Sequence, residues 1–519
     1  MPISTRAGHA RRSFLAAGFG LLMVLTACES AVEQSAGGGG GATDPQPGGT
    51  LTIASSSDAQ PNALLAQRAG NATWRYLVFE TLTRFDAERQ PQPLLAEDWE
   101  VSQDELTMTL QLRDDVLFHS GRAMTAEDVV FSLQQVQDPV SASQVRTVAE
   151  QITDMSATGE HEVTLQFARP LPAIFDVFEL TPVVDPETYG QITSGEQVIG
   201  TGPFTWESWQ PGASLSLARF EDYWQEDLPY LEGVDISVIT DSTALLSAVQ
   251  TGSADVAAGM IPRDAVPLAA GDGFELLEGG GTVYLYGMDV TAEPFDDPRV
   301  RQAVGYAIDR ERILEQVFQG QGEATDLWWS PDEAGYSEEL ATTYTYDPER
   351  ARQLIEEAGA TGAEVPMAVP AIPAPQGIGE IIQFNLEEIG LRPTPAVLDV
   401  AQFDSRQVAG DLGQSFNLLH GLVGFSAPTL LDAMPSLRAG NPSNFDTPEY
   451  QTLRQAVQEA GDDDERAAAV ADLSQYLLDQ AFSQVLVQSP NLFVTSDEVQ
   501  GLEANVLGGL IVTDTYLQQ

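Results

Sequence analysis

The stretch that decides the fold class is residues 106–136, which read LTMTLQLRDDVLFHSGRAMTAEDVVFSLQQV. Its first seven residues place apolar side chains at every second position, and this alternation predicts a strand with one buried face. Further on, Thr125 and Asp128 resemble a capping box, with Asp in place of the usual Glu or Gln, and they predict a helix that ends before Pro139. A strand followed closely by a helix is typical of folds that mix the two elements.

The rest of the chain repeats both patterns. Short alternating runs predict further strands at residues 50–54, 163–167, 215–217, 234–238, 484–487 and 492–494. Helices are expected to begin at four N-cap residues, three of which directly precede a proline: Asp297, Asp309, Asp347 and Thr447. Because strands and helices occur in both halves of the chain, we expect α/β lobes.

The N-terminus has the order of a secretory signal. Arg11 and Arg12 precede an apolar run, which is shorter than the ~20 residues of a membrane span and ends at the single cysteine, Cys28. Residues 25–28, Leu-Thr-Ala-Cys, resemble the lipobox of bacterial lipoproteins, in which the thiol is lipidated and becomes the new N-terminus. We therefore expect a signal peptide at residues 1–27 and a lipid on Cys28, with an incidental cysteine in an ordinary signal as the alternative. The arginine pair leaves Sec and twin-arginine export open.

Residues 28–49 are expected to form a flexible linker. They include five consecutive glycines at positions 37–41 and almost no side chain that could enter a core. A lipid followed by a loose linker predicts a protein held at the extracytoplasmic face of the bacterial cell membrane. With Cys28 lipidated no disulfide can form, so the stability of the body has to come from burial, which a body of this length can supply. The content of 43% apolar residues argues against a disordered chain.

The charge of the chain is extreme. It has 77 acidic residues against 24 basic ones, all of them Arg, and three of the arginines lie in the signal, so the mature net charge is −56. This charge disfavours nucleic acid and anionic membrane surfaces as partners. Our hypothesis is a salt-adapted surface, which a melting temperature that stays flat from low to molar NaCl would contradict. GC-rich codon usage is the alternative, and it explains the missing Lys better than the surplus of acids.

Several segments occur in the order and spacing of one protein family. They lie at residues 93–102, 112–121, 125–132, 200–204, 223–224, 250–256 and 294–303. Together they resemble the family 5 extracellular solute-binding proteins, which are the peptide, nickel and opine receptors of ABC importers. The resemblance covers roughly residues 50–500.

The resemblance implies an α/β fold with two lobes, like the class II periplasmic binding proteins. The first lobe is expected at residues 50–285, with a subdomain inserted at about 76–197, and the second lobe at 286–480. Residues 481–519 are expected to return to the first lobe. Both connections then act as hinges, and the ligand is enclosed between the lobes before the closed form docks on a membrane permease.

The implied function is solute capture for an ABC permease and ATPase complex by a monomer without cofactor or catalytic activity. A peptide or peptide-like ligand is favoured, while a sugar, an opine, a metal chelate or a sensor role without transport stay open. A secreted hydrolase is disfavoured because no Gly-x-Ser-x-Gly elbow occurs, and His119, His161 and His420 lie too far apart for zinc spacing. The motifs at residues 118–121 and 200–204 are expected to form turns.

Candidates for ligand contact lie in four places along the chain. They are Gln60 and Asn62 on the loop after the first strand, Trp74 and Tyr76 beyond it, Trp328 with Trp329 in a Gly-rich loop, and Gly424, Phe425 and Ser426. For the adjacent tryptophans, packing in the core is an equal alternative.

The last of these places departs from the family pattern. Peptide receptors of this family carry an aspartate a few residues before a proline, where it clamps the ammonium group of the peptide. Matching on Pro428 puts Gly424 in that slot, and no acid occurs in residues 420–427. A buried ammonium without a counter-charge is costly. Either Asp432 or another acid takes the role, or the ligand lacks a free α-amino group, which we favour.

Overall fold

The computed structural model describes residues 45–518, apart from residues 67 and 142. The predicted signal peptide, the cysteine at position 28 and most of the predicted linker lie outside the described residues, so the structure does not bear on them. Within the described part of the chain, no helix combines the length and apolar character that crossing a membrane requires.

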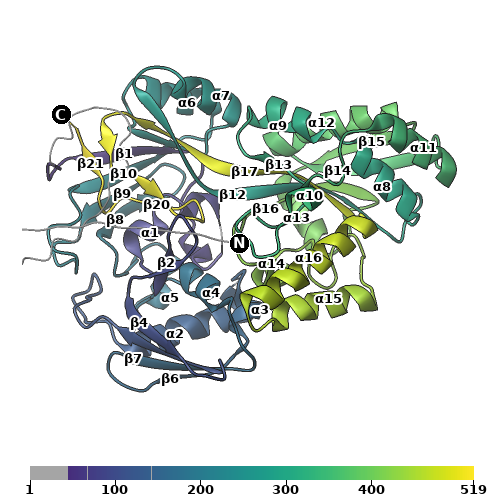
Figure 1. Cartoon of the computed structure of the whole chain (residues 1–519). Coiled ribbons are helices and arrows are strands. Elements are labelled where there is room, and N and C mark those ends of the chain that lie inside the picture. The colour runs from purple at the N-terminus through teal and green to yellow at the C-terminus, as the bar shows by residue number, and fades with distance from the viewer. Residues whose placement is uncertain (1–44, 67, 142, 519) are drawn as a thin grey trace, which may run out of the picture. The chain divides into compact units, whose positions relative to one another are not determined.

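One mixed sheet of eleven strands runs through the described chain (Figure 1), in the order β15-β14-β16-β12-β17-β11-β1-β10-β9-β8, with β13 (Glu323–Ala324) on β17. The first lobe contributes β1 (Thr50–Ser55), β8 (Phe204–Gln210), β9 (Ser214–Arg219), β10 (Gly233–Val238) and β11 (Val256–Ala258). The second lobe contributes β14 (Glu364–Pro370), β15 (Arg392–Leu398) and β16 (Ser415–His420). Each predicted strand in these regions is confirmed.

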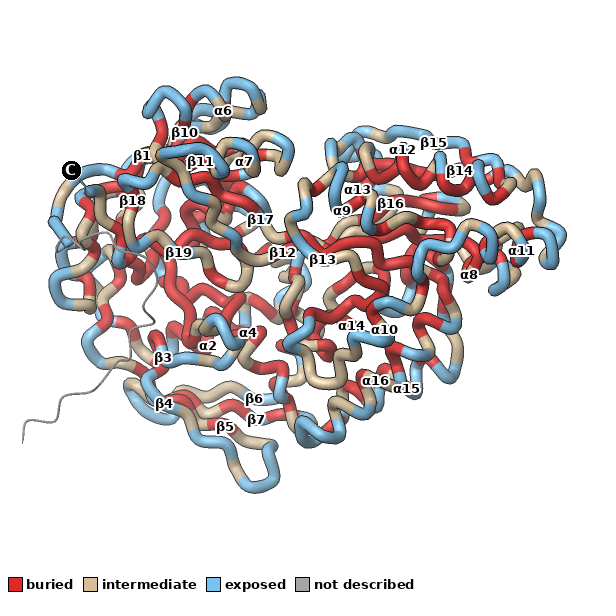
Figure 2. The backbone as a smooth tube through the Cα atoms, turned by 45° about the horizontal axis from the view of Figure 1, so that its top comes forward, coloured by how far each residue is buried: buried red, intermediate tan, exposed pale blue. Residues whose placement is uncertain are grey.

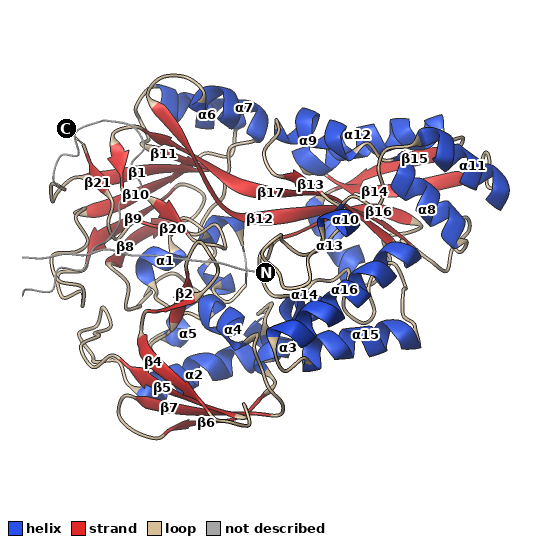
Figure 3. Cartoon of the chain, in the orientation of Figure 1, coloured by secondary structure: helices blue, strands red, loops and turns tan. Residues whose placement is uncertain are grey.

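Two long strands, β12 (Phe274–Met288) and β17 (Ser483–Ser496), join the lobes and pair with each other (Figure 3). The strands predicted at 484–487 and 492–494 are confirmed, and both lie in the one strand β17. The register shifts between Gly279 and Thr282, so Pro490 lies where the ladder has no pair for it and its missing N–H costs no hydrogen bond. Figure 2 shows β17 as a largely buried strand.

Helices cover the sheet in both lobes. The first lobe has α6 (Ser242–Gln250) and α7 (Pro262–Ala269), and the second has α8 (Pro298–Ala307), α9 (Arg310–Phe318), α11 (Pro348–Ala358), α12 (Pro373–Glu388), α13 (Val400–Val408), α14 (Ala427–Ala433), α15 (Pro448–Glu459) and α16 (Asp463–Gln480). The four predicted N-caps are confirmed, because the side chains of Asp297, Asp309, Asp347 and Thr447 each accept a hydrogen bond from a backbone N–H in the first turn.

The inserted subdomain is built on a second sheet, in the order β4-β5-β7-β6. Its elements are β4 (Ala96–Val101), β5 (Thr107–Leu112), β6 (Ile152–Ala157), β7 (Glu162–Phe167), α2 (Ala126–Gln137), α3 (Arg146–Ala149) and α4 (Ile174–Leu180). The capping box of Thr125 and Asp128 is confirmed at the start of α2. The apolar core of this subdomain is continuous with that of the second-lobe helices, so the two regions share buried surface.

The two motifs that the sequence assigned to turns hold each other. The backbone N–H of His119 donates to Gly200 O over 2.9 Å, and its Nε2 lies 2.9 Å from Gly202 O. A Cβ on Gly200 would come within 1.9 Å of Val78 O, so only glycine fits there. Burial lowers the pKa of His119 to about 4, which keeps the ring neutral. These contacts match a structural role.

Candidate functional site

A cavity of about 260 Å³ lies beside the strands that join the lobes, and we call it the hinge cavity. The first lobe supplies residues 55–57 at the end of β1, residues 258–262 at the end of β11, and Ala69, Ala72 and Gly508. The joining strands supply Tyr284 and residues 489–493, and the second lobe supplies Phe318 and residues 372–374. Three parts of the fold therefore meet at one space.

The bend in the joining strands is at this cavity. Residues 279–281 are three glycines, and they face Ser489 to Asn491 across the register shift. Gly280 has φ +62°, which an L side chain rarely adopts. Pro490 and Asn491 are the more accessible points of the interior of β17. A glycine-rich segment paired with a proline is a place where two strands can bend without breaking a regular ladder.

The hinge cavity is apolar with a few polar groups. Tyr284 packs on Phe318, with ring centroids 4.8 Å apart, and burial raises the pKa of Tyr284 to about 12. Its phenol therefore stays protonated at neutral pH. Within the described chain, neither the Tyr284 hydroxyl nor the Asn491 side-chain amide has a hydrogen-bond partner. Both groups are free to bind a solute.

A smaller side cavity of about 150 Å³ adjoins the hinge cavity, and the two share Ala69, Ala72 and Asn491 in their walls. Its far wall is formed by residues 421–423 of the loop that follows β16. This loop therefore separates the space at the hinge from the next pocket between the lobes.

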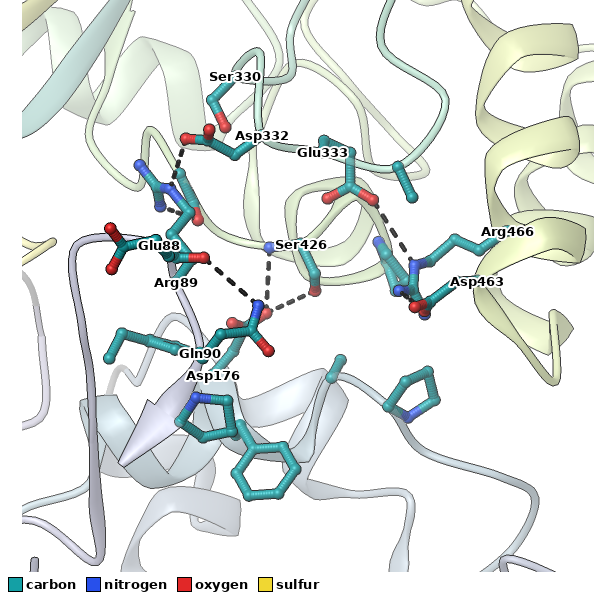
Figure 4. Close-up of a pocket in the computed structure, with 18 residues that line it drawn as sticks. Glu88, Arg89, Gln90, Asp176, Ser330, Asp332, Glu333, Ser426, Asp463 and Arg466 are labelled. Atoms are coloured by element: carbon teal, nitrogen blue, oxygen red, sulfur yellow. Dashed lines mark hydrogen bonds and ion pairs between the residues drawn. The ribbon is translucent and has the colours of Figure 1, made fainter. Parts of the chain in front are cut away.

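That next pocket has a volume of about 360 Å³ and lies between the inserted subdomain and the second lobe (Figure 4); we call it the clasp pocket. It is lined by charged side chains from both sides, which are Glu88, Arg89, Asp176, Asp332, Glu333, Asp463 and Arg466. The predicted residues Gly424 and Ser426 also line it.

Two residues of the subdomain bind the second lobe across this pocket. Asp176 Oδ2 accepts hydrogen bonds from Ser426 Oγ and Thr429 Oγ1, each over 2.5 Å, and from Ser426 N over 3.2 Å. Arg89 Nε donates to Asp332 Oδ2 over 3.2 Å, and Arg89 Nη1 donates to Gly424 O. We call Arg89 and Asp176 with these partners the clasp. Asp176 accepts the backbone N–H of Ser426, the N-cap residue of α14, and Glu333 accepts the next one, that of Ala427.

Two carboxylates of the clasp pocket, those of Asp176 and Glu333, have raised pKa values because they are buried. Burial raises the pKa of Asp176, against the hydrogen bonds from Ser426 and Thr429 that lower it. Burial also raises the pKa of Glu333 to about 7, although Ala427 N donates to its Oε2 over 2.9 Å. The negative charge of Asp176 adds to that increase.

The predicted slot at Gly424 is occupied by an arginine. Gly424 has φ +96°, and a Cβ placed on it would lie 1.7 Å from Arg89 Nη1. Asp432, which the sequence named as a possible substitute acid, forms an ion pair with Arg454 at 3.0 Å and also accepts from Gln458. The acids that bind this loop are Asp176, from the other lobe, and Glu333, and Phe425 is buried.

The other predicted contacts lie elsewhere. Gln60 and Asn62 are exposed on the loop after β1, but neither lines the hinge cavity or the clasp pocket, whose nearest wall on this loop is residues 55–57. Contact of these two residues with a ligand stays a prediction.

The predicted aromatic contacts are buried. Trp74 is fully buried, with its Nε1 donating to Asn71 Oδ1 over 3.0 Å, and Tyr76 lies under Gly509 with 7% of its surface exposed. Trp329 is also fully buried and donates to Ser474 Oγ over 2.7 Å, with Trp328 in the same core. Of the two alternatives for the tryptophan pair, these contacts match core packing.

Sequence reasoning missed four features of the site. Two had a local signal: the glycines 279–281 inside a strand pattern, and the serines 55–57 directly after a strand. Arg89 and Asp176 had none, because their partners lie 335 and 250 residues away along the chain. No group of three or more His, Cys, Asp or Glu that could hold a metal ion occurs in the described part of the chain.

Comparison with known proteins gives a consistent result. The middle region of the bacterial extracellular solute-binding proteins of family 5 matches residues 90–436. Haem-binding protein A of Haemophilus influenzae is 28% identical over 396 residues, which cover 69% of this chain and 68% of that protein. The glutathione-binding protein GsiB of Salmonella typhi is 30% identical over 288 residues, which cover 54% of this chain and 56% of that protein.

Solved structures extend the match over nearly the whole chain. The periplasmic binding protein AgaA of A. tumefaciens R10, bound to agropinic acid, superposes with a TM-score of 0.78 at 23% identity, covering 91% of this chain and 99% of that one. At this identity the likeness shows the fold alone. It confirms the predicted two-lobed, periplasmic-binding-protein-like fold.

Proposed function

Because the chain belongs to the bacterial extracellular solute-binding proteins of family 5, we propose that it captures a small solute in the hinge cavity and delivers it to the permease and ATPase complex of an ABC importer. The observation that carries this proposal is that the cavity and the bendable segment coincide. Residues 489–491 line the cavity and also face the glycines 279–281, so a change in the bend changes the cavity directly.

Closure is the step that the solute has to drive. Reversing a 99:1 preference for the open form takes about 5.5 kcal/mol of extra affinity for the closed form. At ~25 cal/mol per Å² this corresponds to roughly 220 Å² of apolar surface removed from water. The apolar side chains of the cavity, such as Met260, Phe318 and Phe493, are the surfaces against which a solute would be buried.

The ligand class we propose is a peptide or peptide-like compound without a free α-amino group. Arg89 supports this, because its guanidinium fills the space beside Gly424 where peptide receptors of the family hold an ammonium group. An ammonium there would meet a like charge. A sugar, an opine or a metal chelate in the same cavity is the alternative, as is a surface sensor that does not transport.

The protein is held at the membrane by a lipid anchor and does not convert its solute. We propose that the protein is exported, lipidated at Cys28 and held as a monomer at the extracytoplasmic face of the cell membrane, with residues 28–49 as its linker. A tether of this kind raises the local concentration of receptor beside its permease. The solute leaves chemically unchanged.

Mass spectrometry of small molecules released from denatured, purified protein tests the proposal. We expect one solute, bound stoichiometrically, that raises the melting temperature when it is returned to the emptied protein. Conversion of that solute by the protein would contradict the proposal, as would unchanged small-angle scattering profiles with and without it.

A further inference from the structure

The walls of the hinge cavity carry no charge, although the chain has 77 acidic and 24 basic residues. Charged residues make up 19% of the sequence, so about four would be expected among the 21 residues that line this cavity. Among those described lining residues there is no Asp, Glu, Arg or His. The polar groups are hydroxyls and one amide, from residues 55–57, Tyr284, Ser489 and Asn491.

The clasp pocket shows that this is not a general property of the space between the lobes. Seven of its 18 lining residues are charged, and Figure 4 shows Arg89 directed at Asp332 and Asp176 directed at Ser426. Charge is therefore excluded from one pocket and concentrated in the other, within the same cleft region.

The charged residues near the hinge cavity are engaged or lie outside it. Asp58 follows the serine run directly, but its carboxylate accepts hydrogen bonds from Trp209 Nε1 over 3.0 Å and from Gly212 N over 2.6 Å. Arg68 lines the side cavity only. A charged group of a solute buried in the hinge cavity would lose its water without gaining a counter-charge, which is strongly unfavourable.

We propose that the hinge cavity selects a solute that is uncharged at neutral pH, with an apolar face and a few hydrogen-bonding groups, such as a blocked or cyclic dipeptide or a glycoside. This inference rests on the proposed capture of a solute in the hinge cavity. The apolar face packs against Tyr284 and Phe318, and the Tyr284 hydroxyl and the Asn491 amide, which have no partners in the described chain, bind the polar groups.

The first test separates solutes by charge before they are identified. Yeast extract is passed through a strong cation-exchange resin in the H⁺ form and then through a strong anion-exchange resin in the OH⁻ form, which together also retain zwitterions. The neutral flow-through and the two eluates are each brought to pH 7 and added to the wild-type protein in a thermal melt. We expect the neutral fraction alone to raise the melting temperature. Stabilisation by either charged fraction overturns the inference but leaves solute capture standing, whereas stabilisation by none overturns solute capture itself.

The second test places one charge in the cavity. Asn491→Asp changes an exposed amide at the junction of the two cavities to a carboxylate of the same size. We expect the affinity for the active component of the neutral fraction to fall tenfold or more at pH 7.5, and to fall less in Asn491→Ser, which loses the amide but gains no charge. Gln134→Glu, the same chemical change on the exposed face of α2, is the control and should leave the affinity unchanged. Wild-type affinity in Asn491→Asp overturns the inference.

Discussion

The hinge cavity and the clasp pocket lie between the same lobes and have comparable volumes, about 260 and 360 Å³, yet their chemistry is opposite. The first is uncharged and built where two shared strands bend. The second is charged and built from segments that are distant in sequence. We infer that the cavity decides which solute is bound, and that the clasp stabilises the closed form once the lobes meet.

Among the variants that test this difference between the two pockets, we expect the largest loss of solute affinity for a change in the clasp. Asp176→Ala leaves the Ser426 N–H and the two hydroxyls without their acceptor, and hydrogen bonds to a charged group contribute about 1.5–3 kcal/mol each. We expect about 3 kcal/mol less stabilisation of the closed form and solute affinity lower by roughly 100-fold, measured by calorimetry.

Asp176→Asn is the matched variant, because it keeps one acceptor oxygen at the same place. Asp176→Asn should lower solute affinity less than Asp176→Ala does, and both variants should bind the same solutes as the wild type. A changed solute preference would show that the clasp takes part in selection.

The hinge is expected to give the next largest effect. A Cβ on Gly280 would be held at φ +62° and would lie 2.4 Å from the carbonyl carbon of Leu507. Gly280→Ala should therefore lower the free energy of unfolding by about 2 kcal/mol in urea titration.

Gly212→Ala separates the cost of the positive φ from the cost of the steric clash. Gly212 has φ +75°, but no atom lies within 4 Å of the place that a Cβ would take. The loss there should be about 1 kcal/mol, from the backbone conformation alone. Equal losses at both positions would mean that the hinge is not closely packed.

The pH dependence should differ between the two pockets. The pKa of Glu333 is raised to about 7, above its ordinary value of 4.5. Between these values the folded state binds more protons than the unfolded one, so the free energy of unfolding falls as pH rises from about 4.5 to about 7. Glu80 and Glu179, whose pKa values are also raised to about 7, add to this slope.

In Glu333→Gln, the free energy of unfolding should fall less between pH 5 and pH 7.5 than in the wild type, by on the order of 1–2 kcal/mol, as measured by urea titration. Glu127→Gln, at an exposed position of α2, should leave the slope as it is. Tyr284 does not titrate in this range, so intrinsic binding in the hinge cavity should be flat with pH. If the free energy of unfolding of Glu333→Gln falls with pH as steeply as that of the wild type, Glu333 does not contribute to the pH dependence.

The smallest effect is expected for Arg89→Ala. Arg89 and Asp332 are 3.2 Å apart with 60% of the Asp332 side chain exposed, and exposed pairs contribute about 0–1 kcal/mol. The loss of solute affinity should be measurable by calorimetry at 0.1 M NaCl and smaller near 1 M, where only the contribution of the hydrogen bond to Gly424 O remains. Arg219→Ala removes a pair of the same length within one lobe, and should leave solute affinity unchanged.

Local signals were enough to predict most of the fold. The alternation in β5 and β7 and the caps at Asp297, Asp309, Asp347 and Thr447 each act within a few residues, and each is confirmed. The sequence did not show that residues 484–487 and 492–494 belong to one strand, β17, because the effect of Pro490 depends on the register of its partner strand. Pairing between distant strands is not visible in one segment.

The site was harder to predict, for a physical reason. A tryptophan in a loop gains from burial in a core as much as from a ligand, so Trp329 could not be assigned before its partner Ser474 was known. The clasp depends on residues brought together only by the tertiary fold, such as Asp176 and Ser426. The sequence did show that the loop before Pro428 lacks the aspartate found in peptide receptors of the family. The structure places the Arg89 guanidinium beside Gly424, in the position of that aspartate.

The most direct test of closure over a solute is the distance between the lobes. Val140 in the subdomain and Val408 in the second lobe are 89% and 80% exposed, so both can be changed to cysteine and spin-labelled, with Cys28, the single cysteine, replaced by serine. Double electron–electron resonance should show a long, broad distance distribution in the emptied protein and a shorter, narrow one after the released solute is returned. Identical distributions in the two states would contradict the account.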